Sequence, residues 1–174
     1  MKHAFLIITH QYTHVLETLF RMIDDERNDI FVHIDKKVDH SYEDKIVKLV
    51  KKSDLYFVKR HKVYWGHVSQ IKAELELFQS ANDKKTYSYY HLLSGSDLPI
   101  RSQDEMHHFF DRFQGREYIS FSEDEMPERM MYKWLFPRHL RGLCSSSKWI
   151  YRKINKLQNV FTQNFIEFQK SYRL

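Results

Sequence analysis

Four short polar stretches, each close behind an apolar run, carry the residue types that could do chemistry. They contain, in chain order, Thr9 and His10, Asp35 and Lys37, Trp65 and Gly66, and Ser94 to Asp97. The pair of Asp35 and Lys37 suits a nucleotide, because a carboxylate accepts hydrogen bonds from ribose or base while an ammonium group approaches a phosphate. Trp65 beside a glycine can stack on a sugar or a base. A solvated loop at Asp35 and an ordinary core position for Trp65 remain the alternatives.

The elements around these stretches alternate between two hydrophobic periods. Apolar runs predict strands at residues 3–10, 29–37, 54–60, 87–95 and 117–121. Helical spacing predicts helices at about 15–23, 41–52, 68–81 and 102–113. Ser41 is a candidate N-cap, and Ser102 with Glu105 has the spacing of a capping box. The alternation predicts an α/β fold, with a mostly parallel sheet flanked by helices.

The polar stretches fall at the carboxyl ends of the predicted strands, where open parallel sheets bind their ligands. In the last of them, Gly95 permits a sharp turn and a close backbone approach. Asp97 can accept hydrogen bonds from that turn or from a ligand, and Pro99 fixes the direction of the exit. We therefore expect the four stretches to form one site.

Length, charge and cysteine content limit the class of protein. The 174 residues suit one domain, and the net charge of +5 arises from basic residues interspersed with acidic ones. This mixture disfavours a nucleic-acid binder, although the charge itself favours an anionic partner. Cys144 is the only cysteine, and the apolar run at 4–8 is too short for a signal peptide or a membrane span. We expect a cytoplasmic protein without an intramolecular disulfide.

Several familiar sites are disfavoured by their missing residues. His10 and His14 have the spacing of a zinc hydrolase helix, but Gln11 stands where such a site needs a glutamate. The chain contains no GxGxxG, no GxxxxGK[ST] and no GxSxG motif. We expect neither a metal nor an organic cofactor.

Taken in order, the motifs resemble those of the core-2/I-branching β-1,6-N-acetylglucosaminyltransferase family, glycosyltransferase family 14, which is related to the peptide xylosyltransferases. The matching stretches are "FLIITHQ", "DIFVHIDKK", "VYWGHVSQIKAELELF" and "YYHLLSGSDLPIRSQDEM", within residues 3–121. The resemblance implies a Rossmann-like GT-A fold and an inverting transfer of N-acetylglucosamine or xylose from a UDP-sugar to an acceptor hydroxyl of a glycan or glycoconjugate.

The resemblance also implies residue roles. Ile8, Thr9 and His10 would line the nucleotide pocket, and Asp35 and Lys37 would contact the uridine portion. In the same comparison, Trp65 and the adjoining Gly66 would lie against the donor, and Asp97 would shape the donor site.

The family lacks the Asp-x-Asp metal motif, and so does this chain. Fixed Lys and Arg groups can neutralise the departing UDP in place of a cation. The resemblance places the catalytic glutamate of the family, and the Arg and Lys pair that holds the diphosphate, beyond the point that corresponds to residue 174, so no base is assigned and we expect a chain truncated at its C-terminus. A nucleotide-binding remnant without activity is therefore the alternative function.

The C-terminal part predicts a basic amphipathic helix. Apolar residues recur at steps of three and four at Ile150, Ile154, Leu157, Phe161, Phe165, Phe168 and Tyr172. Packing within the domain or against the missing half is the main interpretation, and a peripheral membrane contact through 148–172 is the alternative. We expect one domain, with a donor-binding core at 1–125 and a helical extension at 126–174.

Overall fold

Two strands with no exposed face form the centre of the protein. In the computed structural model, which describes residues 2–39, 41–64 and 67–119, β1 (His3–Thr9) and β2 (Asn28–Ile34) are buried almost throughout. β3 (Asp54–Phe57) pairs with β2, and β4 (Tyr89–Ser94) pairs with β1. All pairs are parallel, in the order β3-β2-β1-β4. The predicted α/β fold is confirmed.

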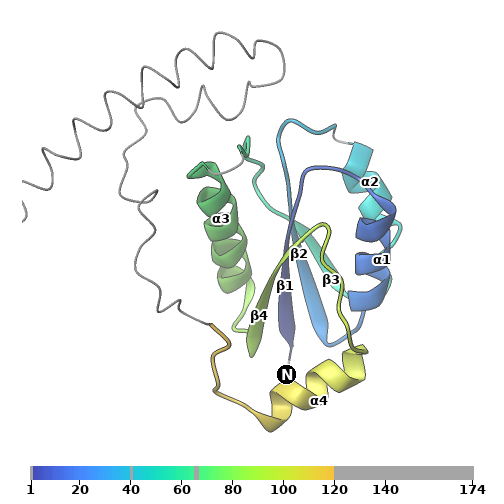
Figure 1. The fold of residues 1–174 in the computed structure, drawn as a ribbon, viewed down its shortest axis with the longest axis vertical. Coiled ribbons are helices and arrows are strands. Elements are labelled where there is room, and N and C mark those ends of the chain that lie inside the picture. The colour runs from blue at the N-terminus through green and yellow to red at the C-terminus, as the bar shows by residue number, and fades with distance from the viewer. Residues whose placement is uncertain (1, 40, 65–66, 120–174) are drawn as a thin grey trace, which may run out of the picture. The chain divides into compact units, whose positions relative to one another are not determined.

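Helices cover both faces of this sheet (Figure 1). α1 (His14–Ile23) and α2 (Ser41–Val47) lie on one face, and α3 (Ser69–Lys84) lies on the other (Figure 1). Alternate residues of β1 serve the two sides, because Phe5 and Ile7 pack with α1 while Ala4 and Leu6 pack with α3. Because β1 contributes side chains to a hydrophobic core on each face of the sheet, its sequence is an unbroken apolar run.

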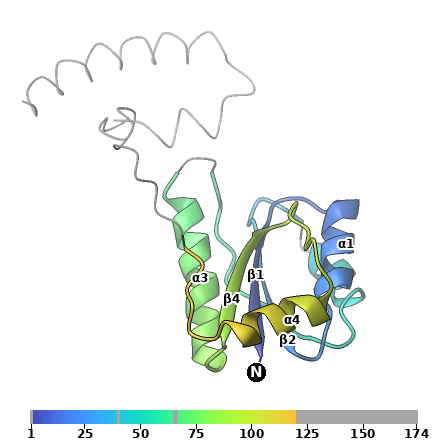
Figure 2. The same cartoon turned by 60° about the horizontal axis from the view of Figure 1, so that its bottom comes forward.

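α4 (Gln103–Arg112) crosses the amino ends of the strands (Figure 2). Its buried His107 hydrogen-bonds the Asn28 amide oxygen through Nε2 at 2.8 Å. The predicted capping box is confirmed, since the Ser102 hydroxyl accepts from the Glu105 amide and the Glu105 carboxylate accepts from the Ser102 amide. α4 thus lies at the amino ends of the strands, whereas the predicted site lies at their carboxyl ends.

Several predicted boundaries were wrong, and those of α2 and β2 have a clear cause. Ser41 is the first residue of α2 and not its cap, and the Asp39 carboxylate accepts its amide proton at 2.7 Å. α2 ends at Val47 rather than at residue 52, because the Asp24 carboxylate accepts three consecutive amides, from residues 51–53, and turns the chain into β3. β2 ends at Ile34 because Asp35 begins a turn, with Val38 N donating to its carbonyl.

Of the elements predicted for the C-terminal part, only residues 117–119 lie within the described structure. Residues 117–119 of the predicted fifth strand are not in a strand, and residues 120–121 lie outside the described part. The predicted boundary at 125/126 and the helix at 148–172 also lie outside it and stay predictions. By contacts the chain divides into one unit of residues 1–63 and 68–116, which holds all the elements named above, and a second of residues 64–67 and 117–174.

No helix among the described residues is long and apolar enough to cross a membrane.

Candidate functional site

The carboxyl ends of β1 and β4 meet without space for a side chain between them. Gly95 N donates a hydrogen bond of 2.8 Å to the Ile8 carbonyl. A Cβ on Gly95 would lie 2.7 Å from Thr9 Oγ1 and 2.9 Å from Thr9 Cβ. Glycine is therefore required at this position by the close approach, which is the role that the sequence predicted for it.

The turn that follows Gly95 is closed by Asp97. Its Oδ2 accepts the Ser94 amide at 2.6 Å, and its own amide donates to the Ser94 carbonyl at 3.2 Å. The hydroxyls of Ser94 and Ser96 are 2.9 Å apart. The Asp97 carboxylate thus shapes the turn, and its exposed side chain leaves the turn open to solvent.

Asp35 lies at the neighbouring end of β2 and is joined to β1 by its backbone. Its amide donates to the Thr9 carbonyl at 2.9 Å, and the residue is 3% exposed. Its Oδ1 accepts the Lys37 amide at 2.9 Å, and its Oδ2 lies 3.2 Å from Lys37 Nζ. Lys37 Nζ also donates to the Val63 carbonyl at 2.6 Å. The predicted pair of acid and base therefore exists as an ion pair at the sheet edge.

Three of the four predicted stretches are thus brought together at the place where the strand order reverses. The chain runs from β1 outward to β3 and then returns to place β4 on the other side of β1, which makes the β1/β4 boundary a topological switch point. Ile8, Thr9, Asp35 and Lys37 lie along the ends of β1 and β2, and the turn of Asp97 follows β4. His10 is exposed beside them. Trp65 and Gly66 lie outside the described residues.

Arg60, which was not among the predicted site residues, holds the end of β2 from the side. The guanidinium hydrogen-bonds the carbonyls of Ile34 and Asp35 at 3.3 and 3.0 Å, and a third bond goes to Val38. Arg60 was included in the predicted strand at 54–60, whereas β3 ends at Phe57. No residue pattern signals this role, because the partners of Arg60 are backbone carbonyls.

His33 and His61 were missed as well. His33 is fully buried in β2, and its Nε2 accepts the amide proton of His61 at 3.0 Å. The two imidazole rings stack with centroids 5.7 Å apart. Burial lowers the pKa of His33, and the proximity of His61 lowers it further, so His33 is neutral near pH 7.

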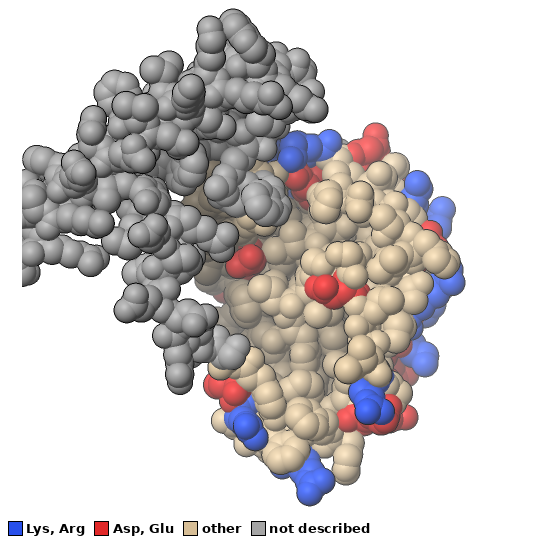
Figure 3. All heavy atoms as spheres, viewed as in Figure 1, with Lys and Arg blue, Asp and Glu red and all other residues tan. Residues whose placement is uncertain are grey.

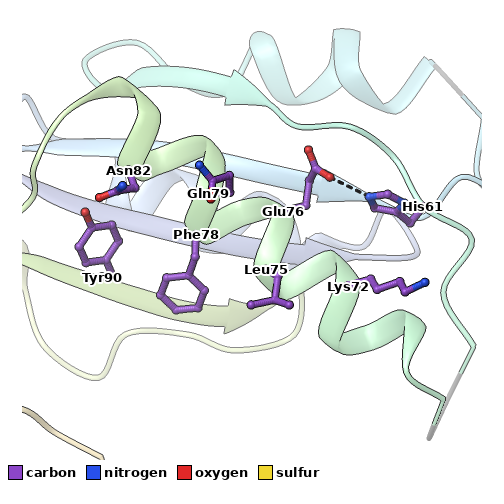
Figure 4. A pocket seen from close by; sticks show the side chains of 8 residues that line it. All are labelled: His61, Lys72, Leu75, Glu76, Phe78, Gln79, Asn82 and Tyr90. Atoms are coloured by element: carbon purple, nitrogen blue, oxygen red, sulfur yellow. Dashed lines mark hydrogen bonds and ion pairs between the residues drawn. The ribbon is translucent and has the colours of Figure 1, made fainter.

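A separate groove of about 770 Å³ runs along the outer side of α3 (Figure 4). His61 and Glu76 face each other at one end, with Nε2 and Oε2 2.9 Å apart (Figure 4). Leu75 and Phe78 project from α3, and Tyr90 of β4 lies near Phe78 (Figure 4). The groove contains none of the predicted site residues.

Surface charge and groups of metal-binding side chains bear on the expected partners and metals. On the face shown in Figure 3, Lys and Arg side chains lie mainly near the rim and are mixed with acidic ones. Within the described residues, no group of three or more His, Cys, Asp or Glu side chains could hold a metal ion. His14 Nδ1 instead lies 3.6 Å from Glu17 Oε2.

The model of the Core-2/I-branching enzyme family matches residues 3–150. The chain belongs to this family. Its members are glycosyltransferases, which take a sugar from a nucleotide-sugar donor and pass it to an acceptor glycan. The resemblance inferred from the strand-end motifs is therefore confirmed. In a comparison with curated proteins, no sequence matches the chain.

Because members of this family bind nucleotide-sugars, the switch point is the candidate nucleotide site of this chain. The described site holds a buried carboxylate at Asp35, engaged by Lys37, and a half-exposed cation at Lys37, on backbone that is already hydrogen-bonded to β1. Such a site can bind and orient a nucleotide. Both aspartates, Asp35 and Asp97, bond amides of their own turns, which suits a binding role better than proton abstraction.

Proposed function

We propose that the chain binds a UDP-sugar at the carboxyl ends of β1, β2 and β4, as the donor site of an inverting, metal-independent glycosyltransferase. The sugar is of the N-acetylglucosamine or xylose type, and the acceptor is a hydroxyl group of a glycan or glycoconjugate. One observation carries the proposal: Asp35 and Gly95 each donate a backbone hydrogen bond to the end of β1. Three motifs that are far apart in sequence therefore share one edge of the sheet.

In this proposal each described residue has a limited task. Ile8, Thr9 and His10 line the nucleotide pocket, while Asp35 accepts hydrogen bonds from the uridine portion. The ammonium group of Lys37 contacts the nucleotide and can approach its phosphates, where fixed positive charge stabilises the departing diphosphate. Trp65 and Gly66 are proposed to lie against the donor. None of the described residues is assigned as the base.

The test is calorimetric titration of the 174-residue chain with UDP and with UDP-sugars, in the presence of EDTA. We expect saturable binding that EDTA does not change, because Lys37 supplies the charge that a metal ion would otherwise supply. Asp35→Asn should weaken UDP binding at least about tenfold, since the carboxylate is replaced by a group of the same shape without charge. Binding that requires a divalent cation would contradict the proposal.

Asp24→Asn is the matched control. Asp24 also uses its carboxylate to hold backbone amides, but those amides belong to residues 51–53, ahead of β3 and away from the switch point. We expect this variant to lose stability and to keep its UDP affinity. Equal affinity in the wild type and Asp35→Asn would exclude the proposed donor site.

A second candidate is a nucleotide-binding protein without transferase activity. It is favoured by the engagement of both Asp35 and Asp97 in their own turns. Turnover of a UDP-sugar by the chain, measured as release of UDP with an acceptor glycan, would exclude this candidate. A cytoplasmic location, with peripheral membrane contact through 148–172, is proposed with either function and can be tested by cell fractionation.

A further inference from the structure

The segment after β3 lies along the turn that carries Asp35 and Lys37. Lys36 N donates to the His61 carbonyl at 2.9 Å, and Lys37 Nζ donates to the Val63 carbonyl at 2.6 Å. From the same segment, His61 N donates to buried His33 Nε2 at 3.0 Å. Residues 60–63 therefore form a support for the turn at residues 34–38.

Arg60 is the centre of this support. Its side chain is only 11% exposed, and its guanidinium bonds the carbonyls of Ile34, Asp35 and Val38. A further contact of 3.3 Å joins it to the Glu43 carboxylate of α2. One planar group thus spans the start and the end of the turn.

The chemistry of the guanidinium explains why this position needs arginine. Several N–H donors in a rigid fork can bond carbonyls that point in different directions, whereas a lysine ammonium group is a single point of charge. Removal of the group would leave three carbonyls and one carboxylate without this partner, in a place where the arginine side chain itself is only 11% exposed. The turn would then sample other conformations.

Asp35 and Lys37 depend on that turn for their geometry. The Asp35 carboxylate receives the Lys37 amide and faces the Lys37 ammonium group, and both contacts lie inside the stretch that Arg60 spans. A loosened turn would move the acceptor and the cation relative to each other. A ligand would then have to order them when it binds, which lowers its affinity.

We propose that Arg60 is a positioning residue for donor binding, holding the turn at residues 34–38 in the geometry in which Asp35 and Lys37 meet the nucleotide. Arg60 acts through these residues and does not touch the donor. This inference rests on the proposed function, because it assumes that UDP binds at the turn.

The test compares UDP affinity and stability in three variants of the full chain. Arg60→Ala should weaken UDP binding about tenfold or more at a temperature where the variant is folded, and Arg60→Lys should weaken it less. Arg27→Ala is the matched control, because Arg27 bonds Asp25 and Asp104 near the amino ends of the strands. It should lose stability while its UDP affinity stays within about twofold of the wild type.

Chemical rescue separates positioning from a loss of folding. Methylguanidinium at about 10 mM should restore part of the UDP affinity of Arg60→Ala, by occupying the space of the missing guanidinium. It should leave the affinity of Arg27→Ala and of the wild type unchanged. If Arg60→Ala does not fold, Arg60→Lys provides the comparison, and its UDP affinity must be lower than that of Arg27→Ala.

The outcomes distinguish this inference from the proposed function. The positioning role would be overturned if folded Arg60→Ala, or folded Arg60→Lys in its place, binds UDP as tightly as the wild type. The donor site would still be upheld in that case if Asp35→Asn binds UDP more weakly than the wild type. If neither the wild type nor Asp35→Asn binds UDP, the donor site is wrong and the role of Arg60 with it. Weaker UDP binding by Arg60→Ala together with rescue supports both.

Discussion

Two glycines of this chain serve different physical purposes. Gly95 is needed because Thr9 is in the way of any Cβ, whereas Gly115 has a φ of 79° and no atom within 4 Å of the place where a Cβ would be. The first constraint is a matter of space and the second a matter of backbone conformation. Substitutions at the two positions should therefore have different consequences.

Gly95→Ala should destabilise the protein by about 1 to 3 kcal/mol, the usual cost of overpacking. It should also weaken UDP binding, because the turn must move away from Thr9. Urea denaturation measures the free energy of unfolding, and calorimetry measures the affinity. Gly115→Ala is the control: it should cost about 1 kcal/mol through its positive φ and leave UDP binding unchanged. Equal UDP affinity in the wild type and Gly95→Ala would show that the turn does not contribute to the site.

At the scale of elements, α4 depends on its capping box. Ser102→Ala removes the hydroxyl that accepts the Glu105 amide, and it should lower the free energy of unfolding by about 1 kcal/mol. Thermal and urea denaturation check this value. Ser80→Ala, inside α3, is the control and should be neutral or slightly stabilising, because alanine favours helix interiors. A loss at Ser80 as large as that at Ser102 would argue against the cap.

The elements themselves could be predicted, because each has a clear hydrophobic period or a local cap. Residues 3–10 read as a strand from their apolar run, and Ser102 with Glu105 identified the start of α4. The ends were less accurate where distant side chains decide them. The Asp24 carboxylate accepts the amides of residues 51–53 and so fixes the chain after α2. No residue within that helix indicates this contact.

The site could be predicted as a set of strand ends, but not as a network. Asp35 and Asp97 were identified by their positions after apolar runs, and the structure adds that each carboxylate bonds its own turn. Arg60 could not be found in this way, because its three carbonyl partners belong to the end of β2 and the turn after it, and backbone carbonyls carry no side-chain signal. Backbone acceptors are invisible in a sequence.

At the scale of the whole molecule, three histidines connect stability to pH. His3, His91 and His107 come from β1, β4 and α4 and pack together near the amino ends of the strands, with His91 Nε2 and His3 Nδ1 3.1 Å apart. Burial, and after it the charge of the neighbouring histidines, lowers the pKa of His3 to about 3 and that of His91 to about 4. Burial, followed by the charge of Arg27, also lowers the pKa of His107. All three are therefore neutral in the folded protein near pH 7.

Acid should destabilise the protein through this cluster. Unfolded histidines bind protons below a pH of about 6.5, while His3 and His91 in the folded protein do so only near pH 3 to 4. The contribution of these histidines to the free energy of unfolding is therefore fully present above pH 6.5, and it decreases as the pH drops below that value. For His3 and His91 together, the slope approaches about 2.7 kcal/mol per pH unit. Urea denaturation between pH 7 and pH 5 measures it.

His91→Gln should reduce that slope, because one of the groups that bind protons on unfolding is gone. The exposed His108 of α4 provides the control, and His108→Gln should leave the slope as in the wild type. Since carboxylates also take up protons in this range, the comparison of slopes is more informative than either slope alone. Identical slopes in His91→Gln and the wild type would contradict the role of the cluster.

The order of the strands has a consequence for how the chain acquires its site. β1 leaves the ribosome before the other described strands, yet Ser94, the residue of β4 that pairs with Ile8, lies 86 positions after it, with β2, β3 and their helices in between. Until β4 is synthesised, one edge of β1 has no neighbour, and unpaired edges are where chains aggregate. Contacts between such distant positions form late, since a long loop must close first. The contact between Thr9 and Gly95 should therefore be among the last contacts of the described sheet to form in the nascent chain.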